Sequence, residues 1–116
     1  MTILVCGGRD YDDQARVTAA LSEFAMTGPH VVVHGAARGA DTLASFAAFA
    51  LGWEVRGYPA NWKRDGKAAG PIRNAEMLAR ERVDLVLAFP GGAGTYDMVK
   101  KARKAGVLVR RIRPAS

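Results

Sequence analysis

The sequence contains a single cysteine and no long apolar run, and each shortage excludes a class of protein. Cys6 has no partner in the chain, which excludes a disulfide framework and a thiolate metal site. No apolar run approaches the roughly 20 residues that cross a bilayer, and the chain opens on strand-like residues instead of a charged and then apolar leader. We therefore expect a cytoplasmic protein with no membrane partner, in which Cys6 is a small core residue.

Three signatures of cofactor and metal chemistry are also missing. The segment Gly7-Gly8-Arg9-Asp10 does not continue into Gly-x-Gly-x-x-Gly, which disfavours a standard dinucleotide dehydrogenase. The glycine-rich segment at 90–95 lacks the Gly-Lys-Ser/Thr of a Walker A loop, so a motor or kinase mechanism loses its main support. His34 has no second histidine or cysteine at ligand spacing, and a strand-end histidine is more often held by polar neighbours. We expect no metal and no cofactor.

What remains is the profile of an ordinary globular protein, and we expect one domain over residues 1–116. Hydrophobic residues make up 49% and charged residues 24% of 116 positions, close to the average of soluble domains. The net charge of +6 is compatible with nucleic-acid binding. Seven of the 17 basic residues, however, lie in the last 17 positions, where a final helix and an edge strand would expose them to solvent. We therefore rank nucleic-acid binding below small-molecule binding.

Short apolar runs alternate with segments of helical periodicity along the whole chain. The runs predict strands at 3–6, 31–34, 53–56, 85–89 and 107–112, and the periodic segments predict helices at 13–27, 40–51, 71–80 and 95–105. Consecutive Val, Ile and Leu residues are typical of parallel strands buried on both faces. The pattern predicts an α/β fold: a Rossmann-like, doubly wound, parallel five-stranded sheet with helices on both faces. We favour the strand order 3-2-1-4-5 over 2-1-3-4-5, which places the ligand crevice beside the loops after strands one and four.

The segment Pro90-Gly91-Gly92-Ala93-Gly94-Thr95 joins the fourth predicted strand to a helix and is the strongest local signal. Glycines there let backbone N–H groups approach a phosphate at the positive end of the helix dipole. Thr95 can cap the helix as its N-cap residue or donate its hydroxyl to a ligand. The alternative is a tight glycine turn with an ordinary cap.

Two other strand-to-helix turns share this chemistry. In the first, at 7–10, Arg9 can bind phosphate bidentately, and Asp10 can accept a ribose hydroxyl or cap the next turn; a purely structural pair is equally compatible. The second follows strand two and reads His-Gly-Ala-Ala-Arg-Gly-Ala-Asp over 34–41, with Arg38 as its cation and Asp41 as a helix-capping carboxylate. Three such turns at one edge of a sheet favour a phosphate-binding rim.

The connection from Gly57 to Gly70 is long for a compact domain, and long loops are usually functional. Trp62 within it can stack on a base or cover the site, or it can anchor the loop to the domain. After it, Pro71 suits the first position of a helix, and Arg73 would lie in the first turn and point at the crevice.

These four segments together resemble the SLOG superfamily, specifically its small YspA/YpsA-related branch. The resemblance rests on residues 7–10, 34–41, 70–77 (Gly-Pro-Ile-Arg-Asn-Ala-Glu-Met) and 90–95, and it covers essentially the whole chain. It implies a Rossmann-like sheet and a nucleotide or nucleotide-derived ligand. The superfamily also contains the LOG phosphoribohydrolases, which form dimers, and the DNA-processing protein DprA, so the resemblance makes a homodimer an expectation as well.

The resemblance to the LOG enzymes breaks down at one catalytic position. Their Arg-Lys-x-x-Met motif is matched by Arg73 and Met77, with Asn74 in place of the lysine. Their Pro-Gly-Gly-x-Gly-Thr-x-x-Glu motif ends at Met98 here, and a thioether cannot act as a general base. Asp97 lies one residue earlier, about 100° away around a helix.

The sequence therefore favours a sensor or regulatory module that binds a nucleotide or ADP-ribose-like ligand. The second hypothesis is a nucleoside monophosphate phosphoribohydrolase with Arg73 and Asp97 as catalytic residues, and the third is DprA-like nucleic-acid binding through the basic C-terminal helix and strand. Trp62 is the expected base or lid contact. The expected phosphate- and ligand-binding residues are Gly7, Gly8, Arg9, Gly35, Arg38, Gly39, Asp41, Arg73, Asn74, Gly91, Gly92, Gly94 and Thr95.

Overall fold

A computed structural model describes residues 1–114 as alternating strands and helices; Ala115 and Ser116, the end of the expected domain, lie outside the described residues. The strands are β1 (Thr2–Cys6), β2 (Val31–His34), β3 (Glu54–Gly57), β4 (Leu85–Ala88) and β5 (Leu108–Arg111). The helices are α1 (Gln14–Ser22), α2 (Ala40–Ala50), α3 (Trp62–Asp65), α4 (Ala69–Arg80) and α5 (Ala93–Lys104), with 3-10 turns η1 (Ala25–Thr27) and η2 (Gly66–Ala68).

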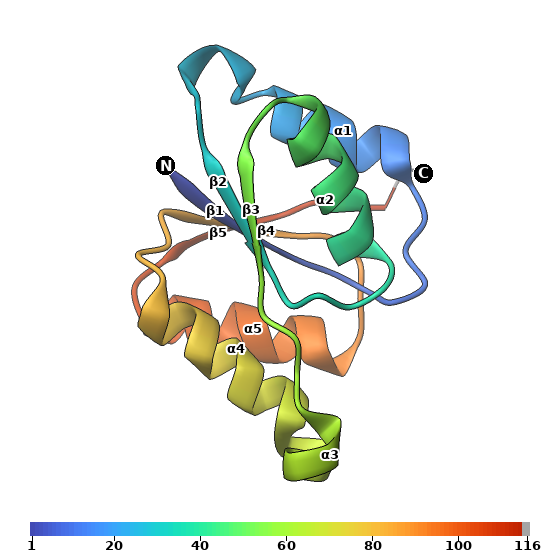
Figure 1. Cartoon of the computed structure of the whole chain (residues 1–116), viewed down its shortest axis with the longest axis vertical. Coiled ribbons are helices and arrows are strands. Elements are labelled where there is room, and N and C mark those ends of the chain that lie inside the picture. The colour runs from blue at the N-terminus through green and yellow to red at the C-terminus, as the bar shows by residue number, and fades with distance from the viewer. Residues whose placement is uncertain (115–116) are drawn as a thin grey trace.

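The strands form one parallel sheet in the order β3-β2-β1-β4-β5, which confirms the Rossmann-like, doubly wound fold and the favoured order (Figure 1). In the central strand, Ile3 pairs with Val32 on one side and Leu85 on the other. The order 2-1-3-4-5 is wrong. Because β1 and β4 are neighbours, the loops at 7–10 and 90–95 leave the same edge of the sheet side by side.

Alternate side chains of the strands pack into two cores, one on each face of the sheet. Ile3 and Val5 pack against α1 and α2, whereas Leu4 and Cys6 pack against α4 and α5. Figure 1 shows the two helix pairs on opposite sides of the sheet. Cys6 is a buried core residue, as expected, and burial followed by the charge of Asp41 raises the pKa of its thiol to about 12. Its thiolate is therefore not available for chemistry at neutral pH.

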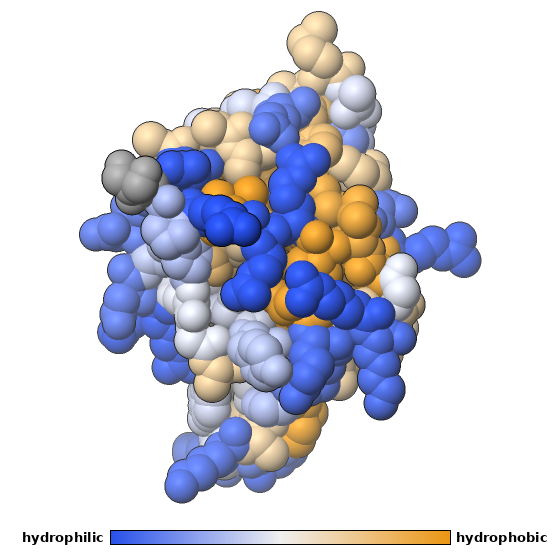
Figure 2. Space-filling model, turned by 180° about the vertical axis from the view of Figure 1, so that it is seen from behind, coloured by the Kyte–Doolittle hydropathy of each residue, from blue (hydrophilic) through white to orange (hydrophobic). Residues whose placement is uncertain are grey.

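The face of the molecule shown in Figure 2 mixes hydrophilic and apolar side chains. In the view of Figure 2, hydrophilic groups surround an apolar area near the middle of the face. The edge strand β5 combines an exposed Leu108 with exposed Arg110 and Arg111, and Arg110 donates to Glu23 at 2.6 Å. Charges on an edge strand discourage edge-to-edge pairing. No helix within residues 1–114 is long and apolar enough to cross a membrane.

The helix predicted over 13–27 is shorter in the structure. Asp13 caps α1 by accepting from the Arg16 N–H at 3.0 Å. At the other end, the N–H of Phe24 bonds to Leu21 O and that of Thr27 to Phe24 O, three residues back in each case. The chain therefore leaves the α-helix after Ser22 and tightens into η1.

Two helices begin earlier than predicted. The helix predicted from Pro71 is α4, and it begins at Ala69, so the placement of Pro71 at the first helical position was wrong. Proline is tolerated there because first-turn N–H groups have no intrahelical partner. An additional short helix, α3, lies inside the expected 57–70 loop, where Asn61 caps it by accepting from the Arg64 N–H at 3.0 Å. The N-cap of α5 is Gly92, so Thr95 is its third residue and not a cap. The remaining boundaries differ by one or two residues.

Candidate functional site

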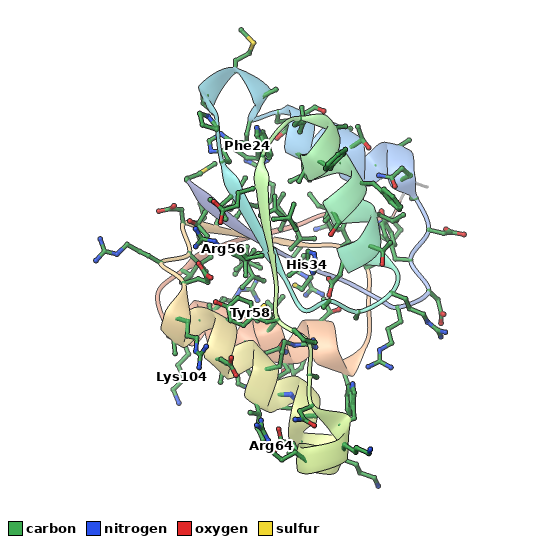
Figure 3. The ribbon with its side chains drawn as sticks, viewed as in Figure 1. Phe24, His34, Arg56, Tyr58, Arg64 and Lys104 are labelled. Atoms are coloured by element: carbon green, nitrogen blue, oxygen red, sulfur yellow. The ribbon has the colours of Figure 1, made fainter. Side chains whose placement is uncertain are left out.

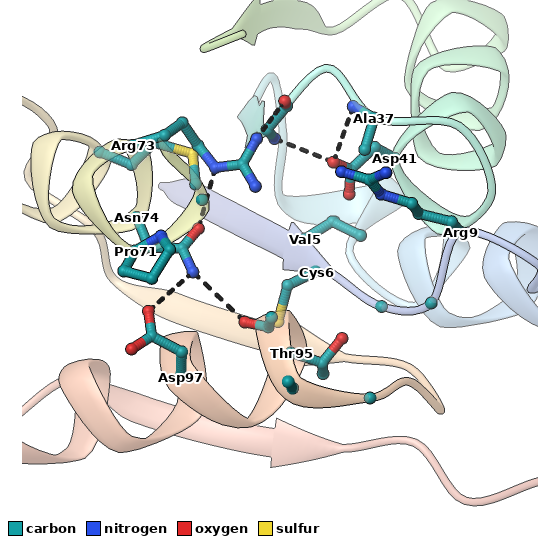
Figure 4. A pocket seen from close by; sticks show the side chains of 18 of the residues that line it. Val5, Cys6, Arg9, Ala37, Asp41, Pro71, Arg73, Asn74, Thr95 and Asp97 are labelled. Atoms are coloured by element: carbon teal, nitrogen blue, oxygen red, sulfur yellow. Dashed lines mark hydrogen bonds between the residues drawn. The ribbon is translucent and has the colours of Figure 1, made fainter. Parts of the chain in front are cut away.

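The carboxyl ends of β1, β2 and β4 open on a cleft with two connected lobes. The inner lobe is a cavity of about 540 Å³ between the sheet edge, α4 and the start of α5 (Figure 4). The outer lobe is a cavity of about 450 Å³ at the loops that follow β2 and β3, and the two share Arg9, Gly35, Ala37, Trp62 and Arg73. The predicted residues that line the inner lobe are Gly7, Gly8, Arg9, Gly35, Asp41, Trp62, Arg73, Asn74, Gly92, Gly94, Thr95 and Asp97. Arg38 lines only the outer lobe, and Gly39 and Gly91 line neither.

The turn between β4 and α5 keeps its backbone donors free. Within residues 1–114 no acceptor is found for the N–H groups of residues 91–95, whereas the next one, of Tyr96, bonds to Gly92 O at 3.0 Å. The Thr95 hydroxyl also has no hydrogen-bond partner in this part of the chain, and its side chain lines the inner lobe. Unpaired N–H groups at the positive end of a helix dipole attract anions. The turn thus presents a ready anion cradle to the cavity.

The three glycines of this turn differ in what surrounds them. A Cβ on Gly91 would collide with the Thr95 Oγ1 atom and would lie 2.7 Å from the Gly8 nitrogen. Gly91 therefore lets the turn pack against the 7–10 loop. A Cβ on Gly92 or Gly94 would meet nothing within 4 Å. These two residues leave the cavity side of the turn open.

In the turn between β2 and α2, by contrast, the N–H groups of residues 35–37 are already used. Asp41 accepts from the N–H groups of Gly35 at 3.1 Å and Ala37 at 3.2 Å, so its carboxylate occupies the turn that an anion would otherwise enter. The Ala36 N–H donates to His34 Nδ1 at 2.9 Å. Gly39 has a φ of +80°, and the carbonyl groups of the 7–10 loop lie against it. A glycine is needed here for the backbone conformation and the close contact.

His34 and Asp41 are both buried, and burial shifts the pKa of each in the direction that favours its neutral form. His34 lies at the end of β2 (Figure 3). Because its Nδ1 accepts a hydrogen bond, its proton lies on Nε2, which donates to Ser45 Oγ at 2.6 Å. Burial, and then the charge of Arg73, lower the pKa of His34. Both of its ring nitrogens have polar partners, as expected of a strand-end histidine. Burial raises the pKa of Asp41 to about 6 in spite of its N–H donors and the charge of Arg73.

Arg73 reaches from α4 across the inner lobe to the loop after β2 (Figure 4). Its Nη1 donates to Gly35 O at 2.5 Å and its Nε to Asn74 Oδ1 at 3.0 Å. Burial lowers the pKa of Arg73, Asp41 opposes this shift and the positive charge of Arg9 adds to it. An arginine side chain nevertheless remains charged. Arg73 and Arg9 are therefore two positive charges that face each other in the cleft.

Asn74 joins α4 to α5 and does not leave a free amide. Its Nδ2 donates to Gly94 O at 3.2 Å and to Asp97 Oδ2 at 3.0 Å. Asp97 also accepts from Lys101 Nζ at 2.5 Å. Burial pushes the pKa of Asp97 up, but these hydrogen bonds and the lysine charges outweigh it and hold that pKa below its ordinary value. Asp97 faces the cavity as an ionised group, whereas Met98 is fully buried in the core.

A model of the YspA, cpYpsA-related SLOG family matches residues 1–64, which include the turns after β1 and β2. The chain belongs to this family. It is also similar to the Gene 61 protein of Mycobacterium phage D29, at 40% identity over 116 residues and 92% of each chain. The X-ray structure of TM1055 has a similar fold, with a TM-score of 0.71 and 20% identity over 94% of this chain and 72% of that one. The resemblance to SLOG proteins is thus confirmed.

Cations at the mouth of the cleft of this SLOG protein come from three loops. The Arg9 guanidinium lies 5.1 Å from the centre of the Trp62 ring, and Trp62, which is half exposed, lines both lobes. Lys67, a cation of the 57–70 connection, lines the inner lobe from η2. Its signal was its place in the long 57–70 connection. Arg38 lies at the rim of the outer lobe, 3.4 Å from Asp10.

The cleft of this SLOG protein can therefore bind an anion through backbone groups and surround it with guanidinium groups. An aromatic ring at the mouth adds a flat apolar surface of the kind on which bases stack. The two carboxylates of the inner lobe are both held by protein donors, Asp41 by backbone N–H groups and Asp97 by side chains. The groups that remain free in the site are therefore best suited to binding an anion.

Proposed function

We propose that this protein binds a nucleotide or a nucleotide-derived, ADP-ribose-like phosphorylated ligand and acts as a sensor or regulatory module. The observation that carries the proposal is the row of unpaired N–H groups at 91–95. This turn borders a cavity of about 540 Å³ that is also lined by three cationic side chains. That volume is within the range of roughly 300–1,000 Å³ typical of ligand pockets. Membership of a SLOG family supports the nucleotide class of the ligand.

In this proposal a phosphate sits on the 91–95 turn, with Thr95 donating its hydroxyl and Arg73 supplying charge. The base or sugar lies against Trp62 at the mouth of the cleft. Asn74 and Asp41 take part indirectly, because their polar atoms hold α5 and the loop after β2 in place. The glycines at 7, 8, 35, 39 and 91 shape the rim, and those at 92 and 94 allow the phosphate to approach.

Calorimetry of the purified protein against a panel of nucleotides and nucleotide sugars tests the proposal. We expect at least one to bind, and Arg73→Gln to weaken that binding by about tenfold or more, the loss of a charged hydrogen bond. Arg80→Gln is the matched control, since Arg80 lies on the same helix with an exposed side chain outside the cleft. A folded protein that binds none of the panel contradicts the proposal.

A nucleoside monophosphate phosphoribohydrolase is the second candidate, and one observation favours it. Asp97 and Asp41 line the same cavity with pKa values shifted in opposite directions, and acid–base pairs often have such divergent environments. With Asp97 as the general base, the protein would release the free nucleobase from nucleoside monophosphates. This activity should be lost in Asp97→Asn and retained in Glu76→Gln. We rank it second because Asp97 is bound to Lys101 and Asn74, and the position of the LOG glutamate is the buried Met98.

Nucleic-acid binding by α5 and β5 has less support, because two of its cations already have carboxylate partners. Lys101 pairs with Asp97 and Arg110 with Glu23. A DprA-like interaction would show steeply salt-dependent binding of single-stranded DNA that Lys100→Gln and Lys104→Gln weaken.

We also propose that the chain forms a homodimer through the outer face of α1 and α2. Over 14–22 and 40–50 the only charged residues are Arg16 and the buried Asp41, in a chain whose net charge is +6. A second copy, equally positive, is least repelled over this face. Phe46 and Phe49 are 65% and 83% exposed there, and exposed alanines of α1 lie on the neighbouring helix. Aromatic side chains are enriched in interface centres.

A further inference from the structure

The outer lobe of the cleft has the chemistry of an anion site, although the 91–95 turn does not reach it. Its lining contains three arginines, Arg9, Arg38 and Arg73, and no carboxylate. Its remaining walls are small or apolar, and its volume of about 450 Å³ is by itself that of a ligand pocket. Three cations that meet only one exposed carboxylate in the described part of the chain, Asp10 beside Arg38, favour an anionic guest.

The guanidinium groups of the outer lobe have donors to spare. Within residues 1–114 no acceptor is found for Arg9, which only stacks on the Trp62 ring. Arg38 has one partner, Asp10, at 3.4 Å, and both side chains are largely exposed, at 76% and 95%. A surface pair of this kind contributes little and is readily exchanged for a better acceptor.

In the turn after β2, by contrast, three backbone donors of the outer lobe are already used. The N–H groups of Gly35 and Ala37 donate to Asp41, and that of Ala36 donates to His34. Recognition here therefore rests mainly on the planar guanidinium forks, which match the oxygens of a phosphate or carboxylate. The inner lobe offers the row of N–H groups of the 91–95 turn and the outer lobe offers a cluster of guanidinium groups, so the two subsites differ chemically.

We propose that the outer lobe is a second anion subsite, and that the ligand carries two anionic groups separated by a sugar- or base-sized part. This inference rests on the proposed function: the first group occupies the 91–95 turn, and the second lies between Arg9 and Arg38. Trp62 and Arg73, which line both lobes, contact the part between them. The ligand class is a nucleotide with phosphates on different carbon atoms, either a nucleoside bisphosphate or a short 5′-phosphorylated oligonucleotide.

Inorganic phosphate tests the subsite without any assumption about the nucleoside. In a titration of ¹⁵N-labelled protein at constant ionic strength, followed by NMR, we expect two groups of signals to move with separate midpoints. The inner group comprises the amides of residues 92–95, and the outer group comprises the Nε–H signals of Arg9 and Arg38. Arg38→Gln should weaken the response at Arg9 by about tenfold and leave the inner midpoint in place. Arg80→Gln, which removes one charge from an exposed arginine 3.6 Å from Glu76, should change neither.

The outcomes separate this inference from the function on which it rests. An outer group that does not respond to phosphate, or that responds equally in Arg38→Gln, overturns the second subsite while binding at the turn stands. An inner group that does not respond contradicts the proposed function itself.

A second titration separates the two sources of the ligand. Adenosine 3′,5′-bisphosphate and a 5′-phosphorylated diadenosine dinucleotide are compared with ADP, whose two phosphates are contiguous. We expect one or both separated-charge probes to bind about tenfold more tightly than ADP, and Arg38→Gln to remove that advantage. Preference for the bisphosphate indicates a free nucleotide, and preference for the dinucleotide indicates a nucleic-acid end. Equal binding of all three overturns the inference.

Discussion

Gly91 and Gly94 lie three residues apart in one turn but have different roles: Gly91 allows close packing, and Gly94 leaves room for a ligand. Because a side chain at 91 would strike the Thr95 hydroxyl and the Gly8 backbone, we expect Gly91→Ala to destabilise the protein by about 1–3 kcal/mol. Nothing surrounds a Cβ at 94, and alanine favours a helix over glycine, so Gly94→Ala should keep or slightly raise the stability. The same methyl group should obstruct the phosphate and weaken nucleotide binding.

Urea unfolding and calorimetry on both variants measure these two effects separately. If Gly94→Ala binds nucleotide as tightly as the unmodified protein, the phosphate does not lie on this turn. If Gly91→Ala is as stable as the unmodified protein, the turn does not depend on its close contact with Gly8.

Asp41 should give the stability of the protein an unusual dependence on pH. Burial raises its pKa from 3.8 to about 6, so the folded protein holds a proton that the unfolded chain releases. Its contribution to stability is therefore fully present below about pH 4 and is lost as the pH rises through 6. The shift corresponds to about 3 kcal/mol.

Asp41→Asn isolates this contribution, since an amide oxygen can still accept from Gly35 and Ala37. We expect the unfolding free energy of the unmodified protein to fall relative to Asp41→Asn between pH 4 and pH 7, by up to about 3 kcal/mol. Urea unfolding of both proteins at several pH values gives the difference directly. A difference that is constant with pH would show that Asp41 ionises normally.

At the scale of the elements, Asn74 is the connection between α4 and α5. Truncation in Asn74→Ala leaves Arg73 Nε and Gly94 O without their partner, and we expect a loss of about 1–3 kcal/mol in unfolding free energy. The variant should also raise the pKa of Asp97, which loses one of its donors. Carboxylate NMR titration reads this second effect, which a merely loosened helix would not produce. Glu76→Ala, on the same helix, should leave the pKa of Asp97 unchanged.

The arrangement of the elements was largely predictable from the sequence, while the hydrogen bonding of the turns was not. Runs such as Leu85–Ala88 identify buried parallel strands, and right-handed crossovers limit their order. The three glycine turns look equivalent in sequence. Only the fold shows that Asp41 reaches back to fill one of them, because that contact depends on how α2 enters from Gly39.

The limits of helix prediction have a similar cause. The start of α5 depends on the non-helical backbone of Gly92 (φ −105°, ψ −138°), and a glycine gives no side-chain signal for it. Likewise, Trp62 and Arg9 are far apart in sequence, and their contact arises only once α3 folds within the 57–70 connection. Asp97 illustrates the same point, since helical phase alone left open whether it faces the cavity.

For the whole molecule, the distribution of charge decides how two copies can meet. With a net charge of +6, two copies repel each other, and they repel least over the face of α1 and α2, whose only unburied charge is Arg16. We expect the protein to sediment as a dimer at low and at high salt, because screening removes a repulsion and no ion pair is needed across this face. A salt-induced dissociation would point to a charged interface elsewhere.

Phe49→Asp tests the face directly. It places two opposed carboxylates near the centre of the dimer, and we expect a monomer with an unchanged circular dichroism spectrum, because Phe49 is 83% exposed and packs little within the chain. Leu108→Asp is the control: it adds the same charge at a residue that is 69% exposed on the edge strand β5, away from α2. If Leu108→Asp dissociates the protein and Phe49→Asp does not, the copies meet along β5. If the unmodified protein is a monomer at every concentration, the apolar face of α2 has no second copy as its partner.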